Sequence, residues 1–209
     1  MIPKKALLKK PGLYLVTDSH AFNGRNLLNI LSGSLKAGLD MVQFRDKAAS
    51  DINFFKTGLR IKKLLKGKAL FIINDRVHMA LALDADGVHL GPMDIPVKIA
   101  RKILGKRKII GLSVSSLKEA LNAQKQPVDY IAIGSIFKTS VKPDYKLVGL
   151  KTLKQVVKKI RIPLVAIGGV NQSNIEEVRK LGVKRIAVVR AILKTRNPYS
   201  ATKKLLKKI

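Results

Sequence analysis

Short apolar runs alternate with amphipathic segments along the whole chain. Near-continuous apolar runs are typical of strands buried on both sheet faces, whereas apolar residues recurring every three or four positions are typical of helices. The apolar runs predict eight strands, at residues 13–17, 41–45, 70–73, 87–90, 108–112, 130–133, 163–167 and 185–189. The amphipathic segments predict intervening helices, at residues 26–36, 54–65, 77–83, 95–104, 116–123, 150–159, 173–182 and 198–206.

This alternation continues without a linker or a low-complexity gap, which favours a parallel sheet with both faces covered by helices. Eight strands are the number that closes into an α/β (β/α)₈ TIM barrel, here predicted as a single domain over residues 1–209. An open doubly wound sheet is the alternative, but no G-x-G-x-x-G motif follows the first strand. In a barrel, polar residues at the carboxyl ends of strands become the candidates for function.

Two helix starts carry a recognisable pattern. Ser116 followed by Glu119 has the spacing of a capping box, in which each side chain satisfies a backbone N–H of the first turn. Ser173 followed by Glu176 repeats that spacing, so we expect a second capping box there.

Composition narrows the class of protein. An apolar content of 46% is ample for a core, and the absence of cysteine excludes disulfides and thiolate metal sites. No apolar run is long enough to cross a bilayer and no signal peptide is apparent, so we expect no membrane partner and a cytoplasmic location.

The formal charge of +29 suggests an anionic partner. The basic residues are spread along the chain rather than clustered, and aromatic residues amount to only 5%, which leaves little surface for stacking bases. Nucleic acid is therefore not the expected partner, although a polyanion binder on a barrel scaffold stays an alternative from a different class.

Two acidic residues follow neighbouring strands. Asp75 comes directly after the strand at 70–73, and Asp94 follows the strand at 87–90. Carboxylate oxygens on one rim suit magnesium (Mg²⁺) that also holds a phosphate group. The alternative is that Asp75 only caps the next helix.

Basic residues and glycines at other strand ends extend this chemistry. Arg45 can hold two phosphate oxygens in a planar fork, and Lys47 and Lys142 can act as mobile charges. Two glycines, Gly168 and Gly169, precede a helix and would let backbone N–H groups approach an anion. Surface ion pairs and an ordinary turn are the simpler explanations. His89, within an apolar strand, is interpreted as a packed or hydrogen-bonded core histidine rather than a base.

Six motifs in register then resemble the thiamine-phosphate synthase family, over about residues 13–192. The resemblance implies a (β/α)₈ barrel transferase that joins a hydroxymethylpyrimidine diphosphate to a hydroxyethylthiazole phosphate and releases pyrophosphate. It also implies a Mg²⁺ cofactor and a dissociative substitution, and a homo-oligomer is possible. The motifs lie at residues 42–47 (VQFRDK), 73–76 (INDR), 85–91 with Asp94, 111–113 (GLS), 134–139 with Lys142, and 165–169 (VAIGG).

The resemblance assigns roles residue by residue. It makes Asp75 and Asp94 the Mg²⁺ ligands, and Arg45, Lys47, Ser113 and Lys142 the catalytic residues. The pyrimidine diphosphate would contact Gln43, Arg45, Lys47, Asn74, Ser113 and Lys142, and Phe44 and Asp46 are further predicted substrate contacts. The thiazole phosphate would contact Thr139, Ser140, Val141, Gly169, Val189 and Arg190.

Three positions depart from the family pattern. Val141 replaces a hydroxyl residue, Arg190 stands where serine is usual, and residues 114–116 lack the usual histidine. The first two bear on the thiazole-side substrate. The third argues against the related thiazole tautomerases, which use a histidine near that place and tend to lose the glutamine kept here as Gln43. A tautomerase-like relative is the nearest alternative.

Overall fold

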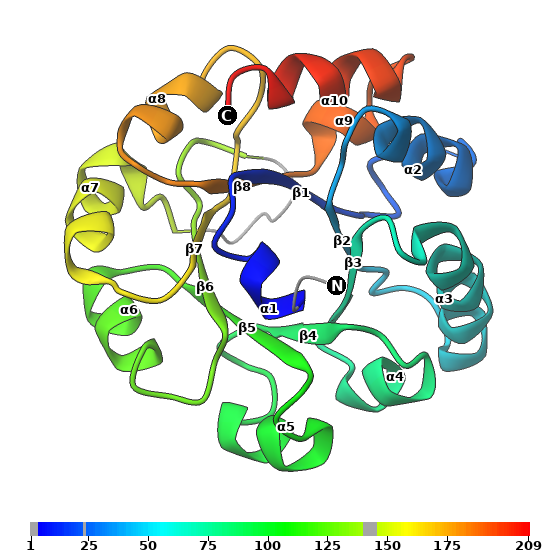
Figure 1. Ribbon diagram of the computed structural model, residues 1–209, viewed down its shortest axis with the longest axis horizontal. Coiled ribbons are helices and arrows are strands. Elements are labelled where there is room, and N and C mark those ends of the chain that lie inside the picture. The colour runs from blue at the N-terminus through cyan, green and yellow to red at the C-terminus, as the bar shows by residue number, and fades with distance from the viewer. Residues whose placement is uncertain (1–3, 23, 140–145) are drawn as a thin grey trace.

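The computed structural model describes residues 4–22, 24–139 and 146–209. Parallel strands close into one barrel in sequence order, and the last strand pairs with the first (Figure 1). This confirms the predicted barrel, and the alternative prediction of an open doubly wound sheet is wrong. The strands are β1 (Gly12–Val16), β2 (Met41–Phe44), β3 (Leu70–Asn74), β4 (Gly87–Leu90), β5 (Ile109–Val114), β6 (Tyr130–Ile133), β7 (Leu164–Ala166) and β8 (Arg185–Val188).

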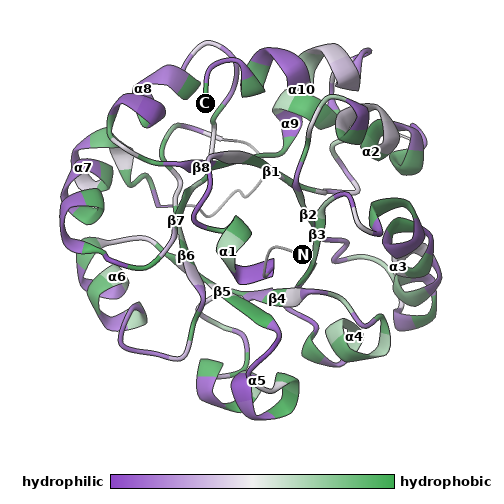
Figure 2. Cartoon of the chain, in the orientation of Figure 1, coloured by the Kyte–Doolittle hydropathy of each residue, from purple (hydrophilic) through white to green (hydrophobic). Residues whose placement is uncertain are grey.

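Helices surround the barrel, and their apolar sides face the sheet while hydrophilic residues face outward (Figure 2). Two four-residue helices, α1 (Lys4–Leu7) and α9 (Arg190–Leu193), were not predicted, because one turn is too short to show a helical period. Among the described residues, no helix combines the length and apolar content that crossing a membrane requires. The outer ring comprises α2 (Leu27–Lys36), α3 (Asp51–Leu65), α4 (Val77–Ala82), α5 (Val97–Leu104), α6 (Leu117–Ala123), α7 (Gly149–Lys159), α8 (Ile175–Lys180) and α10 (Pro198–Leu206).

The core has two parts, because successive strand residues point to opposite faces of the sheet. In β1, Leu13 and Leu15 belong to the cluster between the sheet and the helices. Tyr14 and Val16 belong to a separate cluster inside the barrel, together with Tyr130 of β6. The near-continuous apolar runs of the sequence therefore reflect strands that are buried on both sides.

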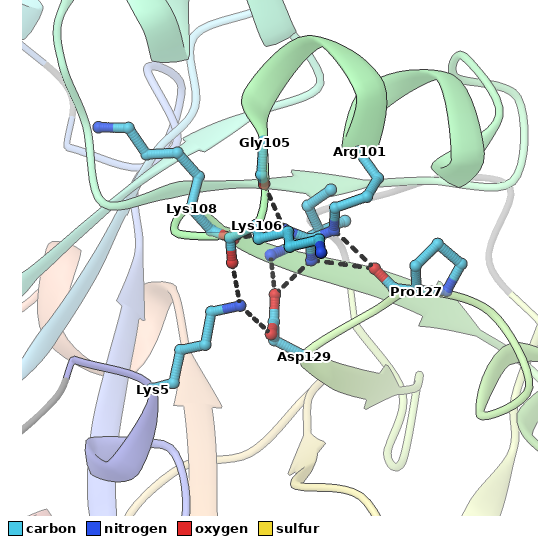
Figure 3. Close-up of polar contacts among 8 residues, drawn as sticks. Lys5, Arg101, Gly105, Lys106, Lys108, Pro127 and Asp129 are labelled. Carbon is cyan, nitrogen blue, oxygen red and sulfur yellow. Dashed lines mark hydrogen bonds and ion pairs between the residues drawn. The ribbon is translucent and has the colours of Figure 1, made fainter.

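The amino-terminal mouth of the barrel is covered by α1, which lies across its centre (Figure 1). Lys5 pairs with Asp129 at 2.7 Å and donates to the Lys106 carbonyl oxygen at 2.7 Å (Figure 3). Arg101 holds the other oxygen of Asp129 at 2.6 Å. Leu8, just after the helix, is buried in the barrel-interior cluster.

A buried arginine completes this closure. Arg185 at the start of β8 is almost fully buried, and its two terminal guanidinium nitrogens each contact the Asp40 carboxylate at 2.8 Å. The same side chain donates to the Leu7 carbonyl oxygen at 2.7 Å. Gly12 leaves room for this pair, since a Cβ there would lie 2.5 Å from an Asp40 oxygen. The accessible mouth is therefore the opposite one, at the carboxyl ends of the strands.

Of the two predicted capping boxes, the first forms in part, because Glu119 bonds the N–H of Ser115 rather than that of the N-cap Ser116, and the second is wrong. Ser116 caps α6 by accepting the Glu119 N–H at 3.2 Å, and Glu119 accepts the Ser115 N–H at 2.7 Å. At α8 the helix begins later, at Ile175, and its first turn has no side-chain cap. Ser173 instead donates its hydroxyl to Asn171 within the preceding loop, at 2.6 Å. The sequence spacing alone could not place that helix start.

Candidate active site

A cavity of about 840 Å³ opens at the carboxyl ends of the strands. Its lining comes from loops after strands throughout the barrel, as expected for this fold. Most of the residues predicted from the sequence meet there, including both acids. The predicted residues that line it are Gln43, Arg45, Lys47, Asn74, Asp75, Asp94, Ser113, Thr139, Gly169, Val189 and Arg190. Ser140, Val141 and Lys142 lie outside the described residues.

Two predicted contacts at the end of β2 lie elsewhere. Phe44 is buried between the sheet and the helices, where its ring centroid lies 4.2 Å from that of Phe54. Asp46 lies beside the main cavity and accepts the N–H groups of Ala48 and Ala49, both at 3.2 Å. The period-two alternation of an extended segment explains this, because residues 43, 45 and 47 share one side.

Arg45 is held in place by a residue that the sequence reasoning missed. Its guanidinium contacts the buried carboxylate of Asp18 at 2.6 Å. The Thr17 hydroxyl accepts the Arg45 N–H at 2.8 Å and donates to the Arg45 carbonyl oxygen at 3.0 Å. Asp18 follows β1 as Asp75 follows β3, so its position at a strand end was the available signal.

The two acids lie together on one side of the cavity. Burial, together with a hydrogen bond and the negative charge of Asp94, raises the pKa of Asp75 above its ordinary value. Lys47 lies 3.7 Å from the Asp75 carboxylate and opposes that shift. Asp94 also accepts the Gly91 N–H at 2.6 Å. The two carboxylates therefore lie close enough to interact, with a lysine beside them.

Asp75 does not cap the helix that follows it. The N-cap position of α4 is Arg76, and no side chain caps that end. Asp75 itself has a φ of 59°, in the left-handed region that non-glycine residues rarely adopt. Such a conformation turns the chain sharply at the end of β3 and leaves the carboxylate facing the cavity. The helix-cap alternative is therefore wrong.

This pair of acids fits a hard divalent cation. Carboxylate oxygens are the preferred donors for Mg²⁺, which often takes only one or two protein carboxylates and completes its shell with water and substrate phosphate. Within the described residues, no group of three or more histidine, cysteine, aspartate or glutamate side chains has the arrangement of a metal site. A cation at Asp75 and Asp94 would thus take its remaining oxygen ligands from water and substrate.

Ser113 lies at the end of a hydrogen-bonded chain. His89 Nε2 lies 2.9 Å from the Ser113 hydroxyl, and His89 Nδ1 lies 2.8 Å from the Tyr130 hydroxyl. Gln43 and Tyr14 continue the chain across the barrel interior. This confirms His89 as a buried, hydrogen-bonded histidine, and its ring also lines the cavity.

The far side of the cavity is built around two glycines after β7. Gly168 has a φ of 101°, and a Cβ there would lie 2.0 Å from the Ser135 hydroxyl oxygen. Gly169 has a φ of 68°, and a Cβ would lie 2.5 Å from the Lys138 carbonyl oxygen. Both positions therefore need glycine, which keeps the backbone open to the cavity. Arg190, at the start of α9, also lines this side.

Further lining residues were not among the predicted site residues. Ser115 and Glu119 come from the start of α6, and Lys138 and Lys146 flank the undescribed segment 140–145. The two lysines add positive charge to a cavity that already contains Arg45 and Lys47. The arrangement as a whole combines one anionic corner with several cations, which suits a metal-bound polyphosphate.

The comparisons with known proteins identify the family of the chain. The family model described as "Thiamine monophosphate synthase" matches residues 13–192. A thiamine-phosphate synthase of Methanobrevibacter smithii is 43% identical over 196 residues, which cover 93% of each chain. One of Clostridioides difficile is 40% identical over the full length of both chains. The solved thiamine phosphate pyrophosphorylase of Pyrococcus furiosus has a TM-score of 0.89 at 39% identity, covering 97% of this chain and 96% of its own. The chain therefore belongs to the thiamine-phosphate synthase family.

Proposed function

We propose that this protein is a Mg²⁺-dependent thiamine-phosphate synthase, which joins a hydroxymethylpyrimidine diphosphate to a hydroxyethylthiazole phosphate and releases pyrophosphate. The observation that carries the proposal is the meeting of Arg45, Lys47, Asp75 and Asp94 at one cavity mouth, in a chain of this family. The cavity volume of about 840 Å³ is of the size that proteins use for small-molecule ligands.

The leaving diphosphate would lie between the basic residues of β2 and the acids after β3 and β4. Arg45 would donate two hydrogen bonds to phosphate oxygens, with Asp18 fixing the guanidinium beforehand so that little reorganisation is needed. Lys47, whose side chain is largely exposed, can move from Asp75 to the diphosphate. When bound at Asp75 and Asp94, Mg²⁺ would neutralise charge that develops on the leaving oxygens.

The reaction itself is a substitution at the pyrimidine methylene carbon. The carbon–oxygen bond breaks first, and its electron pair leaves with pyrophosphate. The thiazole ring nitrogen then uses its lone pair to form the new carbon–nitrogen bond. Because that nitrogen carries no proton, no general base is required, and stabilising the leaving group is the main task. Gln43, Asn74 and Ser113 would orient the pyrimidine ring.

The thiazole phosphate would occupy the side lined by Thr139, Gly169, Val189 and Arg190. Positive-φ glycines leave backbone N–H groups accessible to an anion there. Arg190 lines the cavity, which supports a phosphate contact in place of the serine usual at this position. Roles for Ser140, Val141 and Lys142, a cytoplasmic location and assembly into a homo-oligomer stay proposals from the sequence.

The proposal is tested by incubating the protein with both substrates and Mg²⁺ and measuring pyrophosphate and thiamine phosphate together. We expect equal amounts of the two products, loss of both on chelation, and recovery when excess Mg²⁺ is added. Release that is indifferent to chelation would contradict the roles of Asp75 and Asp94. Conversion of the thiazole alone would favour a tautomerase, and tight, steeply salt-dependent binding of nucleic acid without turnover would favour a polyanion binder.

A further inference from the structure

A continuous hydrogen-bonded chain crosses the inside of the barrel and ends at the cavity. Gln43 Nε2 donates to the Tyr14 hydroxyl at 2.7 Å, and the Tyr14 and Tyr130 hydroxyls lie 2.9 Å apart. The chain then passes from Tyr130 to His89 Nδ1, at 2.8 Å, and from His89 Nε2 to the Ser113 hydroxyl, at 2.9 Å. Its members come from β2, β1, β6, β4 and β5, so only the closed barrel brings them together.

The packing around the chain holds these side chains in place. Gln43, Tyr14, Tyr130 and His89 are between 0% and 6% exposed. The His89 and Tyr130 rings stack with centroids 5.5 Å apart, and the Tyr14 ring meets Tyr130 edge-on at 6.2 Å. Gly111 makes room for the Tyr130 ring, because a Cβ at 111 would lie 2.1 Å from its Cζ. The glycine of the GLS motif therefore allows the Tyr130 ring to occupy its place in the chain.

Burial raises the pKa of both tyrosines, that of Tyr130 well above its ordinary value, so each phenol keeps its single proton. With one proton on each phenol, the Tyr14–Tyr130 and Tyr130–His89 contacts can each run in either of two directions, and the Gln43 contact favours one of them. Since Gln43 donates to Tyr14, the Tyr14 proton is available for Tyr130, and the Tyr130 proton is available for His89 Nδ1. A neutral imidazole that accepts at Nδ1 carries its own proton at Nε2.

We propose that this chain fixes His89 in its Nε2–H tautomer, so that His89 donates to the Ser113 oxygen and the Ser113 hydroxyl proton is directed to the substrate. Tyr130 and His89 are then positioning residues that make Ser113 a dedicated hydrogen-bond donor. The identity of the acceptor, a pyrimidine nitrogen or a diphosphate oxygen, rests on the proposed function. The direction of the chain does not.

The opposite direction would give the site a different chemistry. If His89 carried its proton at Nδ1, its Nε2 would accept the Ser113 proton, and Ser113 could offer the substrate only lone pairs. An anionic diphosphate or a ring nitrogen would then meet an acceptor instead of a donor. A hydroxyl can rotate freely between these roles in water, and a buried chain of fixed direction removes that freedom before the substrate binds.

The first test measures the tautomer directly in the full-length protein without substrates, by long-range proton–nitrogen correlation of ¹⁵N-labelled imidazoles. The chain has 3 histidines, so a His89→Gln variant assigns the signals. We expect a pyridine-type shift for Nδ1 and a pyrrole-type shift for Nε2. A pyrrole-type Nδ1, with Nε2 of either type, would overturn the proposal. Because no substrate is present, this result is independent of the proposed function.

The second test is a double-mutant cycle on kcat/KM for the pyrimidine diphosphate, using Tyr130→Phe and Ser113→Ala. We expect each single variant to lose roughly 3- to 10-fold, the effect of one hydrogen bond. If Tyr130 acts through Ser113, Tyr130→Phe in the Ser113→Ala background should change kcat/KM less than twofold. Losses that multiply fully would instead assign Tyr130 a merely structural role and contradict the proposal.

Two further variants separate stability from positioning. Tyr14→Phe breaks the chain one step earlier and should show a smaller version of the same coupling to Ser113. Tyr199→Phe removes a hydroxyl from α10 at the surface and should leave kcat/KM unchanged. Thermal unfolding of each variant reports its folding separately. Suppose that the protein is folded and has the expected tautomer, but that all variants, including Tyr199→Phe, are inactive toward both substrates. The proposed function would then fail, and the proposed direction of the hydrogen-bonded chain would stand.

Discussion

Replacing Arg45 with alanine is expected to lower kcat by about 10²- to 10³-fold, the usual cost of removing one preorganised donor that stabilises developing charge. The expectation comes from the position of the guanidinium, which lines the cavity and is fixed by Asp18 at 2.6 Å. Negative charge grows on the diphosphate as the carbon–oxygen bond breaks, so the loss should be greater in kcat than in substrate affinity. Steady-state kinetics with the pyrimidine diphosphate varied would measure both.

Arg45→Lys and Arg60→Ala are the matched controls for this variant. Lysine keeps the charge but cannot make the two-pronged contact, so Arg45→Lys should recover only part of the lost rate. Arg60 is exposed on α3, away from the cavity, and its replacement should leave turnover unchanged. An Arg45→Ala enzyme with kcat within threefold of the parent would show that the diphosphate does not lie against Arg45.

Asp75→Asn is expected to lower kcat by about 10²-fold or more at a fixed Mg²⁺ concentration, because metal charge stabilisation contributes several kcal/mol to such reactions. The change is isosteric and removes one carboxylate of the pair with Asp94. Part of the activity should return as Mg²⁺ is raised, because the remaining ligand binds the cation more weakly. The measurement is kcat as a function of Mg²⁺ concentration in both enzymes.

For the same variant we expect no loss of folding stability, in contrast to the loss of activity. Burial and Asp94 raise the pKa of Asp75, which means that ionising Asp75 at neutral pH costs folding free energy. Asparagine carries no charge, so Asp75→Asn should unfold at the same temperature as the parent or higher, in metal-free buffer. Glu177→Gln, an exposed acid on α8, is the control for charge removal alone. An inactive variant that is also strongly destabilised would point to a structural role for Asp75.

The strands could be predicted because each is buried on both faces, which leaves an unbroken apolar run in the sequence. Gln43, Arg45 and Lys47 share a side because side chains alternate along an extended segment, and the same rule would have excluded Phe44 and Asp46 from the predicted contacts. The acids Asp75 and Asp94 were predicted on one rim because parallel strands end at the same edge. These inferences needed only local pattern and the rule for where barrels place their sites.

The remaining features depend on contacts between distant segments. Tyr14 and Tyr130 are separated by 116 positions, and their meeting depends on the register with which the barrel closes. Neither residue differs locally from other aromatic residues in buried strands. The four-residue helix α1 is stabilised by ion pairs such as Lys5 with Asp129 rather than by its own periodicity. Asp18 could have been found, since it directly follows the predicted strand at 13–17, but its pairing with Arg45 could not.

The central claim is that residues from the ends of β2, β3 and β4 assemble around one metal-bound leaving group. A crystal structure of the protein with Mg²⁺ and pyrophosphate tests it most directly. We predict electron density for a cation bound by the Asp75 and Asp94 carboxylates, with pyrophosphate oxygens contacting both the cation and the Arg45 guanidinium. Pyrophosphate bound away from Arg45, or a cation bound by neither acid, would contradict the account.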